Sequence, residues 1–119
     1  MAVYTSGQTV GLQDKLVINT DCDNASKNDV FGGSVTMYAI RAKNPSATVC
    51  YLKLYNTAAP VVGTTAPDII IECPGQAEVT WVMQAGVTFN VVSMSAVQED
   101  GHEGTTNPAE NLDVRIVAK

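Results

Sequence analysis

The sequence is dominated by short segments in which apolar and polar side chains alternate, separated by residues that favour turns. In residues 49–55, for example, Cys50 and Leu52 fall on one side of the expected strand and polar or aromatic residues on the other. The connector 56–67 contains two prolines and a glycine, so it is neither a helix nor an internal strand. No apolar segment with a helical period is long enough to form a helix. We therefore expect an all-β chain.

The segments that fit a strand follow one another at a spacing of roughly 8–15 residues, which is typical of sandwiches and barrels. In one of them, Val35, Met37 and Ala39 are expected on one face, while Tyr38 and Ile40 give the other face bulk as well. Such a strand is either central or covered by another chain. The expected strands are residues 15–20, 34–42, 49–55, 68–73, 77–83, 87–96 and 111–117.

An antiparallel β-sandwich of about seven or eight short strands accounts for this pattern, with jelly-roll or immunoglobulin-like wiring. Residues 15–119 are expected to form this single domain, after an N-terminal arm or edge segment at residues 1–14. A tight turn at residues 84–86 is expected to separate two strands. The connector 56–67 is expected to cross between the sheets, as a Greek key requires. Aromatic anchors of the core are Trp81 and Phe89.

The net charge is −5, from twelve acidic and seven basic side chains, and no cluster of Lys or Arg occurs. Binding to nucleic acid or to an anionic membrane is therefore not expected. There is no apolar run of about 18 residues, and the N-terminal residues lack the pattern of a signal peptide. We expect a soluble protein that is made in a cytoplasm.

Three cysteines, Cys22, Cys50 and Cys73, show no spacing typical of a metal site. Cys50 and Cys73 fall in phase with the apolar faces of their strands, where cysteine behaves as a small hydrophobic residue. Free thiols are the favoured interpretation, and a disulfide between Cys50 and Cys73 is the alternative.

Two acidic clusters could bind a metal. In the first, Glu99, Asp100, His102 and Glu103 lie on a polar loop whose spacing matches neither a calcium nor a zinc motif, so a solvated acidic loop is favoured over a metal or acid–base site. The second consists of Asp21, Asp23 and Asp29. It lacks the glycine and the terminal acid of an EF-hand loop, so a loop stabilised by local hydrogen bonds is favoured. We expect no metal, no cofactor and no catalytic activity.

Tyr38, Tyr51 and Tyr55 are expected, from strand phase, to point away from the main apolar face. Aromatic side chains on an outer face suit a protein interface or a platform for sugars. A second core layer, or ordinary cross-strand pairing, explains the same pattern equally well.

Four motifs resemble a group of small virion proteins of tailed bacteriophages. They are Tyr-Leu-Lys-Leu-Tyr-Asn at 51–56, Val-Gly-Thr-Thr-Ala-Pro-Asp at 62–68, the Pro-Gly turn at 74–75 and Val-Thr-Phe at 87–89. The similarity covers roughly residues 49–117.

This resemblance implies a capsid decoration, or cement, protein on the outer surface of the virion, made in the cytoplasm of the bacterial host. Its partner would be the major capsid protein, and it would form a homo-oligomer, with a trimer favoured over a dimer. Repeated shallow contacts can provide binding through avidity. The expected interface residues are Val3, Tyr4, Val10, Leu12, Tyr38, Tyr51 and Tyr55.

A second hypothesis is a tail-fibre or receptor-binding module that holds glycans of the host surface on faces that carry tyrosine. An enzyme is the least supported function, because the sequence contains no Gly-x-Ser-x-Gly, His-Glu-x-x-His or phosphate-binding glycine motif.

Overall fold

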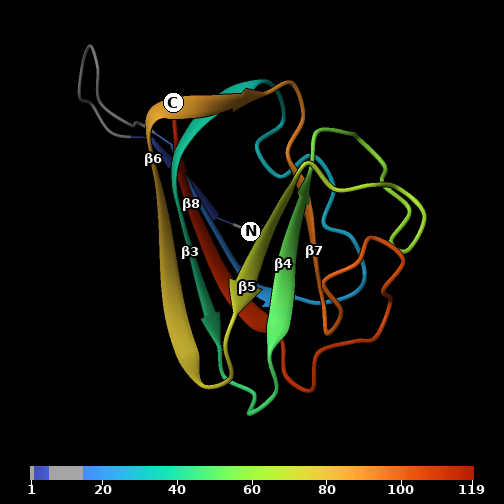
Figure 1. Ribbon diagram of the computed structural model, residues 1–119. Helices are drawn as coiled ribbons and strands as arrows, with labels where there is room; N and C mark the ends of the chain where they lie inside the picture. The colour runs from blue at the N-terminus through green and yellow to red at the C-terminus, as the bar shows by residue number, and fades with distance from the viewer. Residues whose placement is uncertain (1, 6–14) are drawn as a thin grey trace.

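A computed structural model describes the backbone of residues 2–5 and all atoms of residues 15–119. These residues contain no helix that is long and apolar enough to span a membrane. The all-β prediction is confirmed, since the described chain forms two antiparallel sheets that pack as a sandwich (Figure 1). Its strands are β1 (Ala2–Thr5), β2 (Lys15–Cys22), β3 (Val35–Asn44), β4 (Cys50–Tyr55), β5 (Ile69–Cys73), β6 (Ala77–Phe89), β7 (Ser93–Val97) and β8 (Leu112–Ala118).

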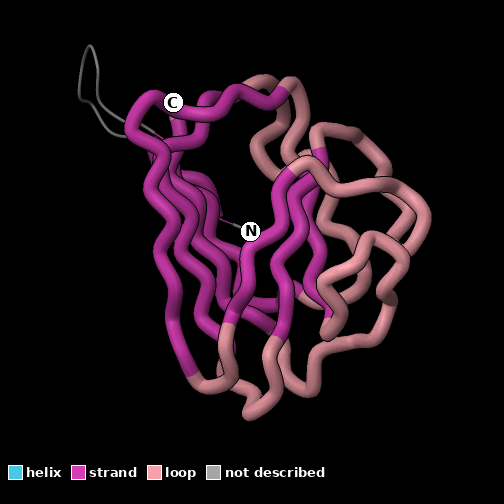
Figure 2. The backbone as a smooth tube through the Cα atoms, viewed as in Figure 1, coloured by secondary structure: helices cyan, strands magenta, loops and turns pink. Residues whose placement is uncertain are grey.

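The order of the strands is that of a jelly roll. One sheet has the order β1-β2-β8-β3-β6 and the other β5-β4-β7, and the two lie face to face (Figure 2). The chain crosses between the sheets after β3, β5, β6 and β7. The sandwich thus has the interleaved strands of two Greek keys, with β1 added beside β2 at one edge.

Residues 23–30 take the place of the strand that a jelly roll has beside β7. Lys27 forms an isolated antiparallel bridge with Met94, and the Val30 N–H donates to the Val92 carbonyl at 2.8 Å. The segment therefore extends the smaller sheet and links β2 to β3 across the end of the sandwich. Of the two wirings left open by the sequence, the structure has the jelly roll.

The connector 56–67 does not cross between the sheets, so that prediction is wrong. β4 and β5 are antiparallel neighbours in one sheet, and the connector joins them as a long hairpin loop. Two hydrogen bonds close its base: the Asp68 N–H donates to the Leu54 carbonyl at 2.8 Å, and the Asn56 N–H donates to Asp68 Oδ2 at 2.7 Å.

The core lies between the two sheets and is built by the side chains that alternate inward along each strand. On β8, for example, every second residue from Leu112 to Ala118 is fully buried. Burial of aliphatic side chains contributes roughly 1.5–3 kcal/mol each, so these strands are held mainly by the hydrophobic effect. The largest buried aliphatic side chains are Met37, Ile40, Leu52, Leu54, Met94, Leu112 and Ile116.

The cysteines are free and buried, as the favoured interpretation of the sequence expected. Cys50 and Cys73 lie directly opposite each other on β4 and β5. Burial raises the pKa of Cys73 to about 11, and it raises the pKa of Cys22 and Cys50 as well. A raised pKa keeps these groups in the thiol form, which reacts poorly.

We therefore expect the native protein to show almost no reaction with a thiol reagent such as DTNB at pH 7.5, whereas all three thiols react after unfolding in guanidinium. Titration of free thiols before and after unfolding measures this. Rapid labelling of one thiol or more in the native state would contradict the burial of the cysteines.

A bulge in β3 changes the phase of its side chains. The register with β8 shifts between Met37 and Ala39. As a result Ile40 is buried (1% exposed), whereas Ala39 lies on the outer face. The prediction that Ala39 shares a face with Val35 and Met37, with Ile40 on the opposite face, is wrong, because a bulge adds a residue and resets the alternation. Of the two alternatives for this strand, the central position is the one observed, since β3 lies between β8 and β6.

Another irregularity changes β6, which is one strand rather than two. Met37 and Ala39 of β3 pair with Val87 and Val82 of β6, so the extra residues of β6 form a large bulge. Residues 84–86, predicted as a turn between strands, belong to this bulge, where the long strand bends over the end of the sandwich (Figure 1).

The two predicted aromatic anchors have different environments. Phe89 is buried at the end of β6 and belongs to the core. Trp81 is 42% exposed, although it pairs with the buried Ile40, because β6 is the edge strand of its sheet. The prediction of Trp81 as a core anchor is therefore wrong.

Candidate functional site

The outer face of the five-stranded sheet carries a row of apolar side chains that crosses four strands. Leu16 on β2 pairs with Val117 on β8, which also pairs with Ala39 on β3, and Ala39 pairs with Val82 on β6. We term these four residues the apolar row. Val82 is 62% exposed and the other three are partly buried. A continuous strip of apolar surface on a soluble domain is typical of a contact site.

Two arginines occupy the next row of the same face. Arg41 on β3 lies directly opposite Arg115 on β8, and we term them the arginine pair. Like charges at such positions repel, and each is balanced by an acid. Arg41 Nε lies 3.5 Å from Glu78 Oε1, and Arg115 Nε lies 3.7 Å from Asp113 Oδ1. Both side chains remain at least 40% exposed, so they keep N–H donors for a carboxylate of another molecule.

Two shallow depressions lie along these rows. Both depressions share Ala39 and Val117, because the small side chain of Ala39 leaves a hollow between larger neighbours. The first is about 300 Å³ and is lined by Leu16, Ala39, Arg41, Thr80, Arg115 and Val117. The second is about 230 Å³ and is lined by Tyr38, Ala39, Val82, Met83, Gln84 and Val117.

The charge on this face differs from the charge on the rest of the molecule. Arg41, Lys43 and Arg115 lie on it with two acids, Glu78 and Asp113. Most other acidic side chains lie on the loops, on β5 or at the end of β2: Asp21, Asp23, Asp29, Asp68, Glu72, Glu99, Asp100, Glu103 and Glu110. Although the net charge of the chain is negative, the named side chains of this face therefore have a small excess of positive charge.

The expected interface residues are not brought together on one surface. Tyr38 lines the 230 Å³ depression on the larger sheet. Tyr51 lies on the smaller sheet, where its hydroxyl donates to Glu72 Oε1 at 3.2 Å. Val3 and Tyr4 lie on β1, in register with Val17 and Leu16 of β2. The remaining arm residues predicted for the interface, Val10 and Leu12, lie outside the described residues.

Tyr55 is not available for an interface, so this prediction is wrong. It is 1% exposed, and its hydroxyl forms a 3.1 Å hydrogen bond with Ser95 Oγ. Strand phase does turn it away from the main core, but the outer face of β4 and β7 is covered. Of the two interpretations of the tyrosines, the second core layer is the correct one for Tyr55.

The acidic loop 98–110 covers part of this outer face. It contacts the buried Lys53, whose ammonium group donates to the Gly101 carbonyl. Burial lowers the pKa of Lys53, while the charges of Glu99 and Asp100 act in the opposite direction. Hydrogen bonds from Thr106 hold the pKa of Glu99 below its usual value, and the Thr106 N–H donates to Glu99 Oε1 at 3.0 Å. The loop is therefore fixed by specific contacts.

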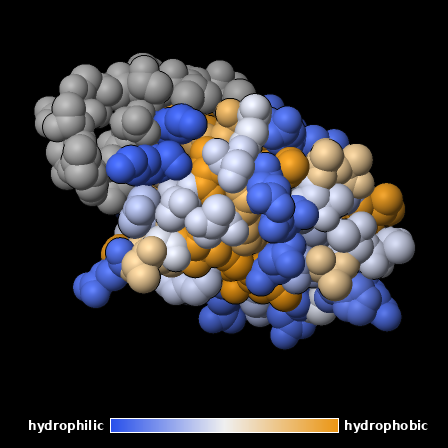
Figure 3. Space-filling model, turned by 90° about the horizontal axis from the view of Figure 1, so that it is seen from above, coloured by the Kyte–Doolittle hydropathy of each residue, from blue (hydrophilic) through white to orange (hydrophobic). Residues whose placement is uncertain are grey.

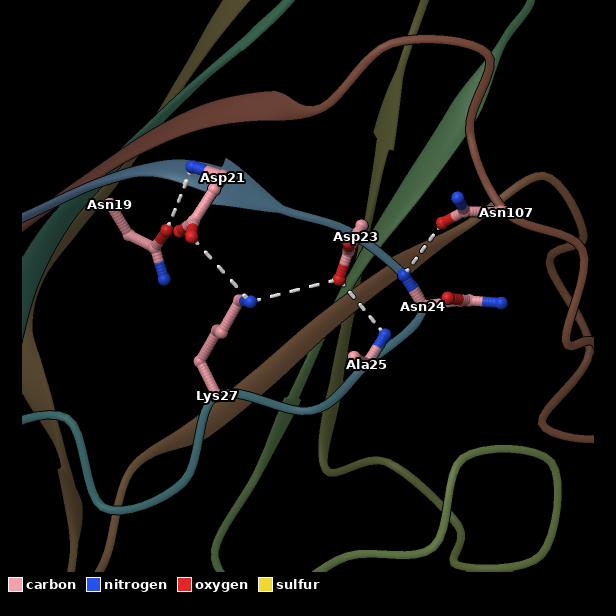
Figure 4. A network of polar contacts seen from close by, with 7 residues as sticks. All are labelled: Asn19, Asp21, Asp23, Asn24, Ala25, Lys27 and Asn107. Carbon is pink, nitrogen blue, oxygen red and sulfur yellow. Dashed lines mark hydrogen bonds and ion pairs between the residues drawn. The ribbon is translucent and has the colours of Figure 1, made fainter.

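The Asp-rich segment after β2 is also held by local contacts, as expected. Lys27 Nζ lies 3.8 Å from a carboxylate oxygen of each of Asp21 and Asp23 (Figure 4). Asp23 Oδ1 also accepts the Ala25 N–H at 3.0 Å. A lysine ammonium group thus occupies the position between the two carboxylates. Within the described part of the chain, no group of three or more His, Cys, Asp or Glu side chains is arranged to hold a metal ion.

The apolar row and the arginine pair were not found by sequence reasoning. The sequence signal that could have indicated them was the presence of large side chains on both faces of an expected strand, as in residues 34–42. Figure 3 shows apolar surface exposed between polar side chains. The large apolar side chains with the greatest exposure are Val61, Ile70, Trp81 and Val82.

The protein is thus a jelly-roll sandwich whose larger sheet has apolar side chains and two arginines on its outer face. Comparisons with protein-family models, with curated proteins and with solved structures find no match to this chain.

Proposed function

We propose that this protein is a structural component of a tailed-phage virion, without catalytic activity, that decorates and stabilises the outer capsid shell. The resemblance of residues 49–117 to phage virion proteins supports a place in the virion. The outer face of the larger sheet supports a contact with the capsid shell through this face. The observation that carries the proposal is the apolar row beside the arginine pair. It offers apolar area and exposed guanidinium groups on one surface.

The chemistry of the face defines the patch that it fits on the major capsid protein. An apolar side chain of that protein would enter one of the two depressions, and a carboxylate beside it would accept hydrogen bonds from the arginine pair. Guanidinium groups bind carboxylates in a fixed geometry, which orients the contact. An oligomer that makes several such weak contacts with one shell would then be held firmly through avidity.

The glycan alternative lacks the platform that it needs. Tyr55 is buried, and Tyr38 and Tyr51 lie on different sheets. The three tyrosines therefore do not form one stacking surface for a sugar.

The proposal is tested by co-sedimentation of the purified protein with shells assembled from the major capsid protein encoded with it. We expect saturable binding at high copy number. In the double variant Arg41→Gln/Arg115→Gln, we expect binding to weaken by about tenfold or more, because charge-assisted contacts of this kind are worth about 1.5–3 kcal/mol.

A matched control is Glu103→Gln/Glu110→Gln, which also neutralises two charges but on the exposed acidic loop. We expect this control to bind as tightly as the unchanged protein. If the unchanged protein does not sediment with shells, the decoration function is wrong. If it binds but the arginine variant binds equally well, the outer face of the larger sheet is not the contact.

A further inference from the structure

Among the described residues, no strand pairs with the outer edge of β6. β6 is the last strand of the five-stranded sheet and pairs only with β3 in the described chain, which leaves the backbone groups on its other side without a strand partner. Figure 1 shows its long straight part along one side of the sandwich. Such an edge is a template for another strand unless charge, proline or a bulge protects it.

The straight part, residues 77–82, has little of this protection. It contains no proline and no lysine, and its single charged residue, Glu78, is paired with Arg41 at 3.5 Å. The bulge begins only after Val82, where β6 bends away. The acidic loop 98–110 lies on the opposite side of the molecule (Figure 1), so another copy can approach this edge without facing that loop.

Two neighbouring side chains on this edge are exposed on opposite faces of the sheet. Val82 pairs with Ala39 on the outer face and is 62% exposed, whereas Trp81 pairs with Ile40 on the inner face and is 42% exposed. A partner that docks on one face would cover only one of them. A strand added alongside β6 covers both, because its own side chains alternate between the two faces.

We propose that β6 pairs antiparallel with β6 of a second copy of this chain, so that the two larger sheets become one continuous sheet. A two-fold contact of this kind is self-complementary. Each copy supplies the sequence Glu-Val-Thr-Trp-Val at 78–82, with apolar side chains for both faces. The edge is close to neutral, which favours self-association in a chain whose net charge is −5. This contact makes a dimer and does not depend on the proposed function.

The test compares Val82→Lys with Val61→Lys. A lysine on a strand edge opposes the addition of another strand, because its charge would have to enter the contact. Val61 is a matched control, since it is 60% exposed but lies on the loop between β4 and β5. By sedimentation velocity over a concentration series, we expect a dimer for the unchanged protein and for Val61→Lys, and at least tenfold weaker association for Val82→Lys.

Trp81 is the only tryptophan, so its fluorescence reports on this edge alone. We expect its emission to shift to the blue as the unchanged protein dimerises and to stay constant in Val82→Lys. A monomer at all concentrations would overturn the proposal, as would an undiminished dimer of Val82→Lys. A dimer whose formation leaves the Trp81 emission unchanged would overturn it too, because strand addition must cover the inner face. Equal urea midpoints of Val82→Lys and Val61→Lys would show that the weaker association of Val82→Lys does not come from a loss of folding.

Discussion

The Asn44→Ala variant is expected to have a free energy of unfolding about 4 kcal/mol lower than that of the unchanged protein, at roughly 1 kcal/mol for each of the hydrogen bonds lost. Asn44 ends β3 and is fully buried. Its Nδ2 donates to the Thr48 carbonyl at 2.8 Å and to the Cys73 carbonyl at 3.0 Å, while its Oδ1 accepts the Ser46 N–H at 3.1 Å and the Ser46 hydroxyl at 2.9 Å.

These four hydrogen bonds connect the two sheets at one end of the sandwich. Asn44 belongs to the larger sheet and Cys73 to the smaller one, and Thr48 lies in the turn that leads into β4. Alanine would leave buried polar groups short of partners, which costs more than the loss of an exposed hydrogen bond. The loss should therefore loosen the contact between the two sheets at this end of the sandwich.

Urea unfolding followed by the fluorescence of Trp81 measures the effect. The control is Asn111→Ala, because Asn111 is exposed and immediately precedes β8, where a surface substitution changes stability by only about 0.5 kcal/mol. Equal midpoints for the two alanine variants would contradict a structural role for the Asn44 hydrogen bonds.

Alternation predicted the strands well where one face of a strand meets the core. Residues 15–20 and 111–117 were expected as strands and lie within one residue or two of β2 and β8. In these segments, burial of one face requires an apolar residue at every second position, and this alternation is visible in the sequence.

Bulges explain most of the errors within strands. The bulge of β3 reverses the phase after Met37, so Ile40 rather than Ala39 enters the core. A glycine suits a turn and a bulge equally, so residues 84–86 could not be assigned from composition. Only the pairing of β6 with β3 shows that these residues form a bulge, and β3 lies far from them in the sequence.

The candidate site could not be predicted because it depends on the register of several strands at once. Leu16, Ala39 and Val117 are far apart in the sequence and meet only through the pairing of β2, β8 and β3. The burial of Tyr55 and Lys53 has a similar cause. Strand phase shows which way a side chain points, but it does not show that a distant segment such as residues 98–110 covers it.

Gly86 fixes the bulge that shapes both the candidate site and the free edge of β6. Its φ angle is +79°, in the left-handed region that favours glycine. A Cβ atom at this position would collide with the methyl group of Thr36 and lie 3.0 Å from Cε1 of Tyr38. Thr36 and Tyr38 both belong to β3, so a side chain at Gly86 would push the two strands apart where the 230 Å³ depression begins.

The Gly86→Ala variant should therefore lose about 2 kcal/mol or more of stability, since the left-handed conformation alone costs a non-glycine residue roughly 1–2 kcal/mol and the collision with Thr36 adds to it. Gly33→Ala is the matched control, because Gly33 has an ordinary φ angle and open space around its Cα. There we expect no loss, or a gain of about 0.4–1 kcal/mol from the stiffer unfolded chain. Urea midpoints of both variants decide the matter, and a Gly86→Ala protein as stable as Gly33→Ala would show that the bend in β6 does not require glycine.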